Sequence, residues 1–459
     1  MLPPMYPRAT LAATILGSSL AFIDGSVVNV ALPALARDLK VDPANLSWAI
    51  NAYLLPLGAL ILLGGALGDH FGRRRLFQIG LSIFTVASVI CAAAPSFAWL
   101  LAARGLQGFG AALLMPNSLA ILGGAFSGEA RGHAIGTWAA AGALAGALGP
   151  IVGGWVVDVA GWRTIFLLNL PLAVGAGYLA WKYVEERKAS RPAPLDVMGA
   201  VLATAALGLL TWALTLASES TGGSSLSWPA ALAGFVLLGA FLQNERKLGD
   251  LAIMPFAIFA SPTFVGLTLL TLFLYGSLGG LVVLLPFFLI RVEHWLAVAA
   301  GAALLPVPVL IGFGSSLMGR VASRYGPRLP LAIGAALVAI GLALYARVGA
   351  NIHYWVDIFP PTLLVAVGMG ACVAPLTTSV MTSVDPDHVG LASGFNNAMA
   401  RIAGLIATAL LGFVFARQES PEAFMVGFHA AALLGASSAA LAAGFALFMI
   451  ESKSAVDEK

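Results

Sequence analysis

The stretch GALGDHFGRRRLFQIG, residues 65–80, is informative about the fold because a related stretch occurs later in the chain. Residues 319–334, GRVASRYGPRLPLAIG, align with it without gaps, 254 positions further on. A second pair, GTWAAAGALAG at 136–146 and GFNNAMARIAG at 394–404, is separated by 258 positions. Because the two offsets agree closely, we predict that the chain consists of two homologous halves.

The sequence around these repeats is strongly apolar. Of the 459 residues, 59% are hydrophobic and 10% are charged, against about 25% charged in a typical soluble protein. Apolar runs of about 20 residues recur along the chain, and each is long enough to cross a hydrocarbon core of about 30 Å. Lipid offers no hydrogen-bonding partner to the backbone, and a barrel would need short alternating strands. We therefore predict an all-α polytopic membrane protein.

Six spans fall in each half, and two further spans lie between the halves. The predicted domains are a six-helix bundle at 1–190, an inserted two-helix hairpin at 191–255 and a second six-helix bundle at 256–459. The fourteen predicted spans are 10–33, 46–67, 76–94, 98–122, 132–157, 163–184, 195–217, 229–244, 262–290, 296–318, 329–348, 356–380, 389–415 and 423–450.

The distribution of basic residues predicts the orientation in the membrane. With the N-terminus inside, the cytoplasmic loops hold sixteen Lys and Arg residues and the opposite loops hold six. Cytoplasmic loops of membrane proteins carry such an excess. We therefore expect a multi-pass protein of the inner or plasma membrane, with both termini in the cytoplasm.

The loop within the first repeat combines glycines with charges. Gly65, Gly68 and Gly72 permit a tight turn and a close approach of helices. Asp69 can accept hydrogen bonds near the start of the third span, and the positive charges of Arg73 and Arg74 keep this loop on the cytoplasmic side. The alternative is a solvated loop whose arginines only obey the positive-inside rule.

Two charged residues lie within apolar spans. Asp24, in SLAFIDGSVVNVALP at 19–33, lies about 13 Å of helix rise from the outer end of the first span. Arg104 lies about 9 Å from the outer end of the fourth span. Charges in hydrocarbon are costly and usually pair with one another. We expect Asp24 and Arg104 to meet, either as a functional pair or as a static structural one.

The fifth span is rich in small residues. Gly142 and Gly146 form a small-xxx-small face, which Gly149, Gly153 and Gly154 extend. Pro150 removes one backbone hydrogen bond and is expected to bend the helix. These glycines are typical either of a specialised motif or of a well-packed span.

Taken together, these motifs resemble the major facilitator superfamily, and more narrowly its fourteen-span drug:proton antiporter branch. The resemblance covers essentially the whole chain. It implies that GALGDHFGRRRLF forms a cytoplasmic latch, that Asp24 carries the coupling proton beside Arg104, and that GALAGALGPIVGG is the signature of exporting members. The implied fold is two six-helix bundles with an inserted hairpin.

Further polar and aromatic residues are candidates to line a central cavity, although each could simply pack between helices. These are Asn29, Tyr53, Gln107, Trp138, Tyr275, Asn396, Asn397 and Arg401.

The sequence also argues against several classes of function. The six histidines lack metal-ligand spacing, and no phosphate-binding glycine loop is present, so we expect no metal, no cofactor and no ATP coupling. Paired acids or an activated nucleophile are not visible, so we do not expect an enzyme. A net charge of +3 gives no indication of nucleic-acid binding.

The predicted function is proton-coupled export of hydrophobic small molecules by alternating access, of the multidrug-efflux type. The expected partners are the lipid bilayer, the exported compound and protons, and we expect a monomer. Two alternatives stay open. The chain could be a dedicated exporter of one endogenous lipid, metabolite or antibiotic, or a membrane sensor or scaffold that does not transport.

Overall fold

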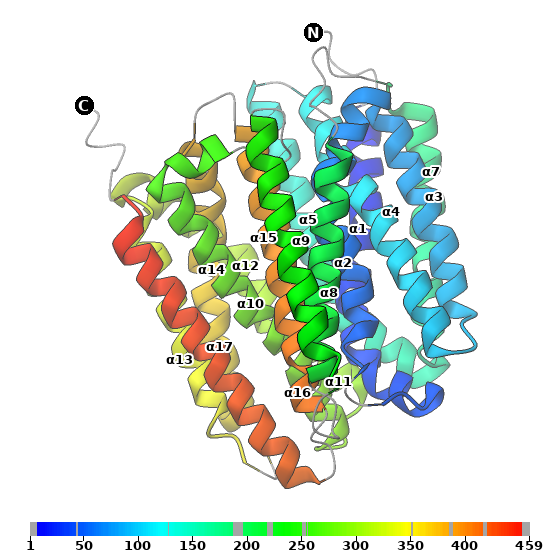
Figure 1. Ribbon diagram of the computed structural model, residues 1–459, viewed down its shortest axis with the longest axis vertical. Coiled ribbons are helices and arrows are strands. Elements are labelled where there is room, and N and C mark those ends of the chain that lie inside the picture. The colour runs from blue at the N-terminus through cyan, green and yellow to red at the C-terminus, as the bar shows by residue number, and fades with distance from the viewer. Residues whose placement is uncertain are drawn as a thin grey trace. The chain divides into compact units, whose positions relative to one another are not determined.

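The computed structural model consists of helices joined by short connections, and no strand occurs among the residues that it describes (Figure 1). The described residues are 7–42, 45–126, 128–186, 196–217, 224–249, 254, 256–349, 352–384, 389–415 and 420–451. The predicted domain junction at 190/191 and both chain ends lie outside them.

Two compact units make up the chain. The first comprises Met1–Val41, Trp48–Ala213 and Trp228–Pro255, and the second comprises Asp42–Ser47, Leu214–Ser227 and Phe256–Lys459. The long helices that lie wholly or mainly in the first unit are α1 (Pro7–Leu39), α2 (Trp48–Phe71), α3 (Arg73–Ala92), α4 (Phe97–Ala125), α5 (Gly128–Ala160), α7 (Asn169–Tyr183), α8 (Val197–Ala217) and α9 (Ser227–Leu248), with the short α6 (Thr164–Leu167) before α7.

The second unit likewise consists of long helices and a few shorter helical segments. Its long helices are α10 (Pro262–Arg291), α12 (Pro306–Tyr325), α13 (Arg328–Tyr345), α14 (Phe359–Thr382), α15 (Val389–Leu410) and α17 (Pro421–Met449). Shorter helical segments are η3 (Phe256–Ala260), α11 (Ala297–Ala302), the π-helix η4 (Tyr354–Ile358) and α16 (Gly412–Phe415).

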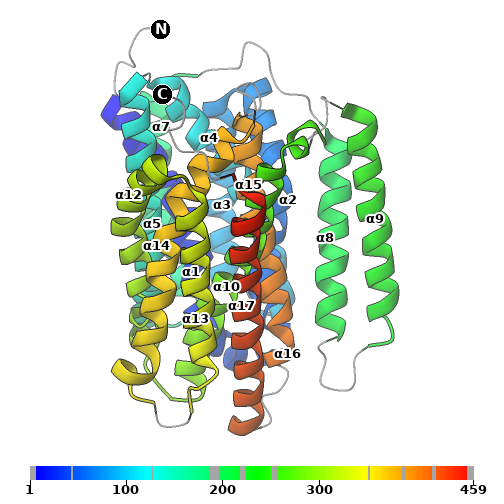
Figure 2. The same cartoon turned by 90° about the vertical axis from the view of Figure 1, so that its left-hand side faces the viewer.

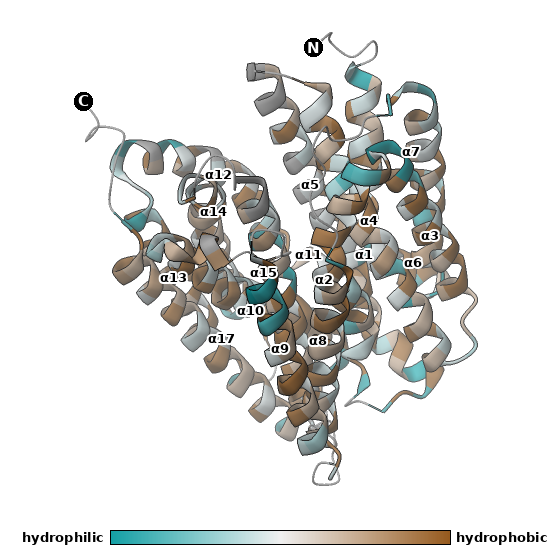
Figure 3. Ribbon diagram, turned by 45° about the horizontal axis from the view of Figure 1, so that its top comes forward, coloured by the Kyte–Doolittle hydropathy of each residue, from teal (hydrophilic) through white to brown (hydrophobic). Residues whose placement is uncertain are grey.

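Twelve helical segments among the described residues are long and apolar enough to cross a membrane. Hydrophobic residues run along most of the long helices (Figure 3), and many large apolar side chains are exposed, such as Trp181 (67%) and Phe313 (78%). Water would strongly disfavour so much exposed apolar surface, whereas lipid accommodates it. The chain is a multi-pass membrane protein.

Proline explains why two predicted spans consist of two helices. The predicted span 163–184 is divided into α6 and α7, and Leu167, at the end of α6, lies four residues before Pro171. The predicted span 296–318 is divided into α11 and α12, and α11 ends at Ala302, four residues before Pro306. Proline has no N–H to donate to the carbonyl four residues earlier, so one helical hydrogen bond is missing at each of these two interruptions.

Glycines allow close helix packing in both units. In the first unit, a Cβ on Gly80 of α3 would lie 2.7 Å from the backbone oxygen of Gly110 in α4. In the second, a Cβ on Gly334 of α13 would lie 2.7 Å from the backbone oxygen of Gly368 in α14. Gly80 and Gly334 occupy equivalent positions of the sequence repeat. Each unit therefore depends on a glycine at this position for backbone-to-backbone contact.

Candidate functional site: a buried ion pair in the first unit

The carboxylate of Asp24 lies in the middle of α1, and none of its surface is exposed. It forms an ion pair with the guanidinium of Arg104 from α4, which is 1% exposed. The two residues are 80 positions apart in the chain. An isolated charge would be strongly disfavoured at such a depth, so the opposite charge is what makes this burial tolerable.

Three groups besides Asp24 hold the Arg104 side chain. Its Nε donates a hydrogen bond to the backbone oxygen of Ala49 in α2 (3.0 Å), and its Nη1 donates to Oε1 of Gln107 (2.8 Å). The guanidinium carbon lies 4.5 Å from the ring centroid of Tyr53, a distance at which a cation is attracted to an aromatic face. Arginine can make these contacts at once because its donors are arranged in a planar fork.

Two side-chain amides complete the shell around Asp24. Nε2 of Gln107 donates to Oδ1 of Asp24 (3.2 Å) and to Oγ of Ser88 (2.9 Å). Nδ2 of Asn169, at the start of α7, donates to the same two acceptors, at 3.4 and 3.2 Å. The hydroxyl of Ser88 in turn donates to the backbone oxygen of Phe84 (2.8 Å). Five helices, α1, α2, α3, α4 and α7, thus contribute to one buried polar network.

This arrangement is chemically suited to holding a proton-accepting group. The hydrogen bonds and the counter-ion satisfy an ionised carboxylate, and a proton on Asp24 would remove the charge that Arg104 neutralises. Protonation would therefore weaken the attraction between α1 and α4.

Sequence reasoning missed Ser88 and Asn169. Asn169 stands in the apolar stretch IFLLNLPLAV at 165–174, so it could have been recognised by the rule that identified Asp24: a polar group in hydrocarbon usually has a partner. Ser88 carries no comparable signal, because a serine can bond to its own helix backbone.

The residues predicted to line a cavity differ in whether they contact the ion pair. Tyr53 and Gln107 contact Arg104, as described above. Trp138 lies apart from the ion pair, and its Nε1 donates to the hydroxyls of Ser18 and Ser118, each at 3.0 Å. Asn29 is buried, and its Oδ1 has no hydrogen-bond partner among the described residues.

The remaining candidates belong to the second unit. Asn396 in α15 accepts a hydrogen bond from the hydroxyl of Thr271 in α10 (2.6 Å). Asn397 is exposed and bonds to the backbone oxygen of Ser393 on its own helix (3.0 Å). Tyr275 and Arg401 are partly buried in α10 and α15 respectively.

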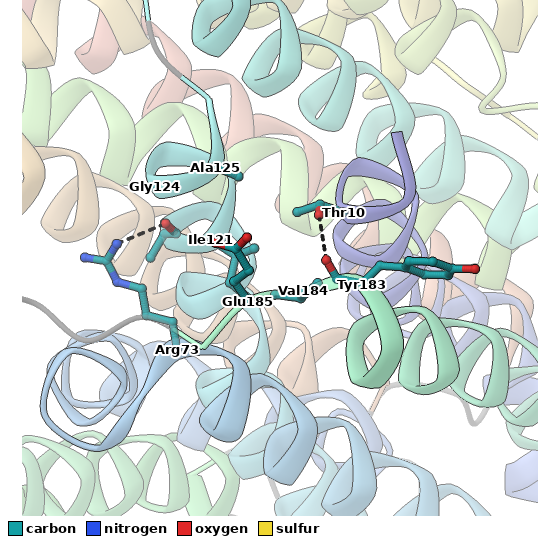
Figure 4. Close-up of a pocket in the computed structure, with 9 residues that line it drawn as sticks. Thr10, Arg73, Ile121, Gly124, Ala125, Tyr183, Val184 and Glu185 are labelled. Atoms are coloured by element: carbon teal, nitrogen blue, oxygen red, sulfur yellow. Dashed lines mark hydrogen bonds between the residues drawn. The ribbon is translucent and has the colours of Figure 1, made fainter. Parts of the chain in front are cut away.

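The predicted latch lies where α2 ends and α3 begins. Arg73 donates to Oδ1 of Asp69 (2.9 Å) and to the backbone oxygen of Ala120 in α4 (3.1 Å), and Figure 4 shows the second of these bonds beside a pocket. Nη1 of Arg74 donates to the backbone oxygen of Val184 (3.1 Å), which follows α7. Within the first unit, the two arginines therefore connect α3 to α4 and to the end of α7.

An acid that the sequence did not single out also belongs to this region. The carboxylate of Glu186 accepts hydrogen bonds from the backbone N–H groups of Arg74 (3.1 Å) and Arg75 (3.0 Å), at the first turn of α3. A carboxylate at a helix N-terminus satisfies unpaired donors and complements the helix dipole. Gly72, with φ +113°, precedes this turn, and a Cβ there would lie 2.6 Å from Glu186 Oε1.

Among the other latch glycines, Gly68 packs against α4. A Cβ on Gly68 would lie 1.6 Å from Oδ1 of Asn117, whereas one on Gly65 would meet only Pro116, at 3.5 Å. Asn117 donates to the backbone oxygen of Gly64 in α2 (2.9 Å). The close contact between α2 and α4 thus requires a glycine at position 68.

The glycines of α5 pack against α1, one turn after another. A Cβ on Gly142 would lie 2.6 Å from the ring of Phe22, one on Gly149 would lie 2.1 Å from Ser26 Oγ, and one on Gly153 would lie 2.1 Å from Val27. Gly146 is less tightly enclosed, with Phe22 O 4.0 Å from its Cβ position. Helix α5 is continuous through the buried Pro150, and Gly154 is also buried. The glycine face therefore lies against the helix that carries Asp24.

Known proteins resemble this chain along most of its length. The family model described as Major Facilitator Superfamily matches residues 14–408. The drug efflux pump JefA of Mycobacterium tuberculosis is 32% identical over 417 residues, covering 89% of this chain and 80% of the relative. The methylenomycin A resistance protein of Bacillus subtilis is 31% identical over 412 residues, covering 88% and 87%.

A solved structure supports the same fold. The crystal structure of a bacterial homolog to the human lysosomal transporter Spinster superposes with a TM-score of 0.68, covering 97% of each chain at 18% identity. An identity this low bears on the fold alone. The family match and the two relatives, which together span most of the chain, establish that it belongs to the major facilitator superfamily.

Proposed function

We propose that this protein is a secondary active exporter that exchanges inward-moving protons for outward-moving hydrophobic small molecules. The single observation that carries the proposal is the buried Asp24–Arg104 ion pair. Arg104 donates hydrogen bonds to Ala49 of α2 and to Gln107 of α4, and Asp24 accepts hydrogen bonds from Gln107 and from Asn169 of α7. Export of drugs is supported by the relatives, one of which is named a drug efflux pump.

In the proposed mechanism, Asp24 takes up a proton from the outer side and releases it to the cytoplasm. The neutral carboxyl no longer attracts Arg104 strongly, so each protonation state favours a different arrangement of the helices. Hydrophobic compounds would move outward in the return step, after the proton has been released to the cytoplasm. The latch residues Asp69 and Arg73 would stabilise one of the two arrangements at the cytoplasmic side.

We further propose fourteen spans, with both termini in the cytoplasm of a cell that carries the protein in its inner or plasma membrane. The candidate spans supply twelve, and α5 (33 residues) and α9 (22 residues) would supply the other two. Each exceeds the roughly 20 residues that a helix needs to cross the bilayer. We propose that the transporter acts as a monomer.

The decisive experiment compares wild type with Asp24→Asn in everted membrane vesicles whose interior has been acidified. A pH-sensitive dye reports proton release when a panel of hydrophobic compounds is added. Wild type should release protons with at least one compound, and Asp24→Asn should lose this response because asparagine has the shape of aspartate but cannot carry the proton. Equal release by both proteins at matched expression would overturn the assignment of Asp24.

A matched control is available on the same helix. Asp38, near the end of α1, forms an ion pair with Arg163, and both side chains are nearly half exposed. An exposed pair of this kind contributes little to stability. Asp38→Asn should therefore retain compound-dependent proton release, which separates a specific effect at Asp24 from the loss of any acid in α1.

A dedicated exporter of one compound is the second candidate. The methylenomycin A resistance protein, named for a single antibiotic, is 31% identical to this chain. The same vesicle assay distinguishes the two possibilities, because a multidrug exporter responds to several chemically unrelated compounds and a dedicated exporter to one.

A further inference from the structure

A second pair of acids lies far along the chain from Asp24, where α8 begins and α9 ends. Asp196 immediately precedes α8, and Glu245 lies in the last turn of α9, just beyond the apolar stretch 229–244. Figure 2 shows the two helices side by side, and Gly234 of α9 contacts Leu210 of α8 along their length.

Asp196 accepts hydrogen bonds from two neighbouring donors. Oδ1 of Asp196 accepts a hydrogen bond from the backbone N–H of Gly199 (2.7 Å), which is the contact of a helix N-cap. Nδ2 of Asn244 lies within hydrogen-bonding distance of both carboxylate oxygens, at 3.2 and 3.1 Å. Asp196 thus lies at the N-terminal end of α8, where the helix dipole is positive.

The environment of Glu245 is different. Its side chain is completely buried. Oε2 accepts a hydrogen bond from the backbone N–H of Met254 (2.6 Å), whereas no donor in the described part of the chain reaches the buried Oε1. A buried, ionised carboxylate with an unsatisfied oxygen is strongly disfavoured.

Gly199 shows how close the two carboxyl groups are. A Cβ on Gly199 would lie 2.2 Å from Oδ2 of Asp196 and 2.6 Å from Oε1 of Glu245. The unsatisfied oxygen of Glu245 and Oδ2 of Asp196 therefore both adjoin the Cβ position of Gly199, so the two carboxyl groups are neighbours. Two carboxyl groups can form a hydrogen bond to one another only when one of them carries a proton.

We propose that Asp196 and Glu245 form a proton-binding site separate from Asp24, in which Glu245 carries one proton and donates it to the Asp196 carboxylate. The bound proton joins the start of α8 to the end of α9, and the Glu245–Met254 hydrogen bond extends this connection to the chain beyond α9. Loss of the proton places two negative charges side by side. Because like charges repel, the start of α8 and the end of α9 are then held together less firmly.

The surrounding charges agree with this assignment. The pKa of Glu245 is raised from 4.5 to about 7: burial, the hydrogen bond to Asp196 and the Asp196 charge raise it, and the Met254 N–H and the Asn244 side chain partly oppose them. Arg246 and Lys247 follow on α9 but are exposed, and neither forms an ion pair with either acid in the described structure. Among the described residues, no cation is thus paired with either acid.

The sign of the effect on stability follows from the raised pKa. Folded protein binds the Glu245 proton more tightly than unfolded protein does, so the contribution to stability is fully present below pH 4.5. It is lost as the pH rises through about 7, where the folded protein must accommodate the charge.

The test measures thermal unfolding of the purified full-length protein in lipid nanodiscs between pH 4.5 and 8.5. We expect the melting temperature of wild type to fall across this range, and Glu245→Gln to show a smaller fall because glutamine stays neutral. Glu186→Gln, at the N-terminus of α3, serves as the matched control and should keep the wild-type slope. An identical slope in Glu245→Gln and wild type would overturn the proposal.

A second measurement does not depend on the stability of that variant. Infrared difference spectra between pH 5.5 and 8.5 should show loss of a protonated carboxyl band in wild type. In Asp196→Asn the loss should occur at a lower pH, because Glu245 then ionises without a neighbouring charge. An unchanged midpoint in Asp196→Asn would count against a shared proton. Neither measurement involves transport, so their outcome is independent of the exporter proposal.

Discussion

At the scale of single residues, the Asp24 carboxylate is stable in the protein interior because several side chains pair with it at the same time. Arg104 neutralises the charge, and Gln107 and Asn169 donate to the carboxylate from two further positions. Such a network is stable when complete, whereas the loss of one member leaves a buried polar group without a partner. The amide of Asn169 therefore supports both the arrangement of the surrounding side chains and the charge of Asp24.

Asn169→Ala tests this role. A hydrogen bond to a charged group contributes about 1.5–3 kcal/mol, so the variant should melt several degrees below wild type and show weakened compound-dependent proton release. Asn397→Ala is the control, because this exposed amide bonds only to its own helix. Equal melting temperatures for Asn169→Ala and wild type would show that the amide does not support the network.

At the scale of helices, contact between α1 and α5 is made by successive glycines rather than by interlocking side chains. Gly142, Gly149 and Gly153 each face a residue of α1 so closely that a methyl group would collide with it. Membrane helices lack a strong hydrophobic drive toward one another, so backbone approach and van der Waals contact hold them together. The position of Asp24 therefore depends partly on α5.

Gly153→Ala is expected to disturb this packing. The added Cβ would lie 2.1 Å from Val27, and valine is restricted in rotation, so the helices must separate at a cost of about 1–3 kcal/mol. Thermal unfolding and compound efflux should both decline. Gly136→Ala, in the same helix, is the control because nothing lies within 4 Å of its Cβ position. Wild-type behaviour of Gly153→Ala would contradict a packing role.

At the scale of the whole molecule, the two compact units each contain a set of long apolar helices, and the hairpin helix α9 is grouped largely with the first unit. The proposed fourteen spans place the α8–α9 connection outside the cell and the end of α9 in the cytoplasm. Twelve spans without a membrane-crossing hairpin would place both positions on the same side.

Cysteine labelling distinguishes these topologies. The native Cys91 and Cys372 are buried and should give little background. We expect Leu226→Cys, in the α8–α9 connection, to react with a membrane-impermeant maleimide in intact cells, and Lys247→Cys to react only after permeabilisation. Both positions are exposed in the structure. Labelling of both residues from the same side would contradict the fourteen-span topology.

Much of the architecture could be predicted because it depends on local composition. Apolar runs of membrane-spanning length identify the helices without any knowledge of their neighbours, and the prediction of a major facilitator protein is confirmed by the family match. The breaks at α6/α7 and α11/α12 were not predicted, although Pro171 and Pro306 indicate them in retrospect.

The sequence by itself determined the class of protein, its apolar helices and the buried charges of Asp24 and Arg104, because the cost of placing a polar group in lipid depends on the residue and its immediate surroundings. Only the tertiary structure decided which groups meet. Asn169 and Asp24 are 145 positions apart, and Asn244 and Asp196 are 48 apart. Such partners are brought together by helix packing, whose rotation and depth depend on side chains from several helices at once.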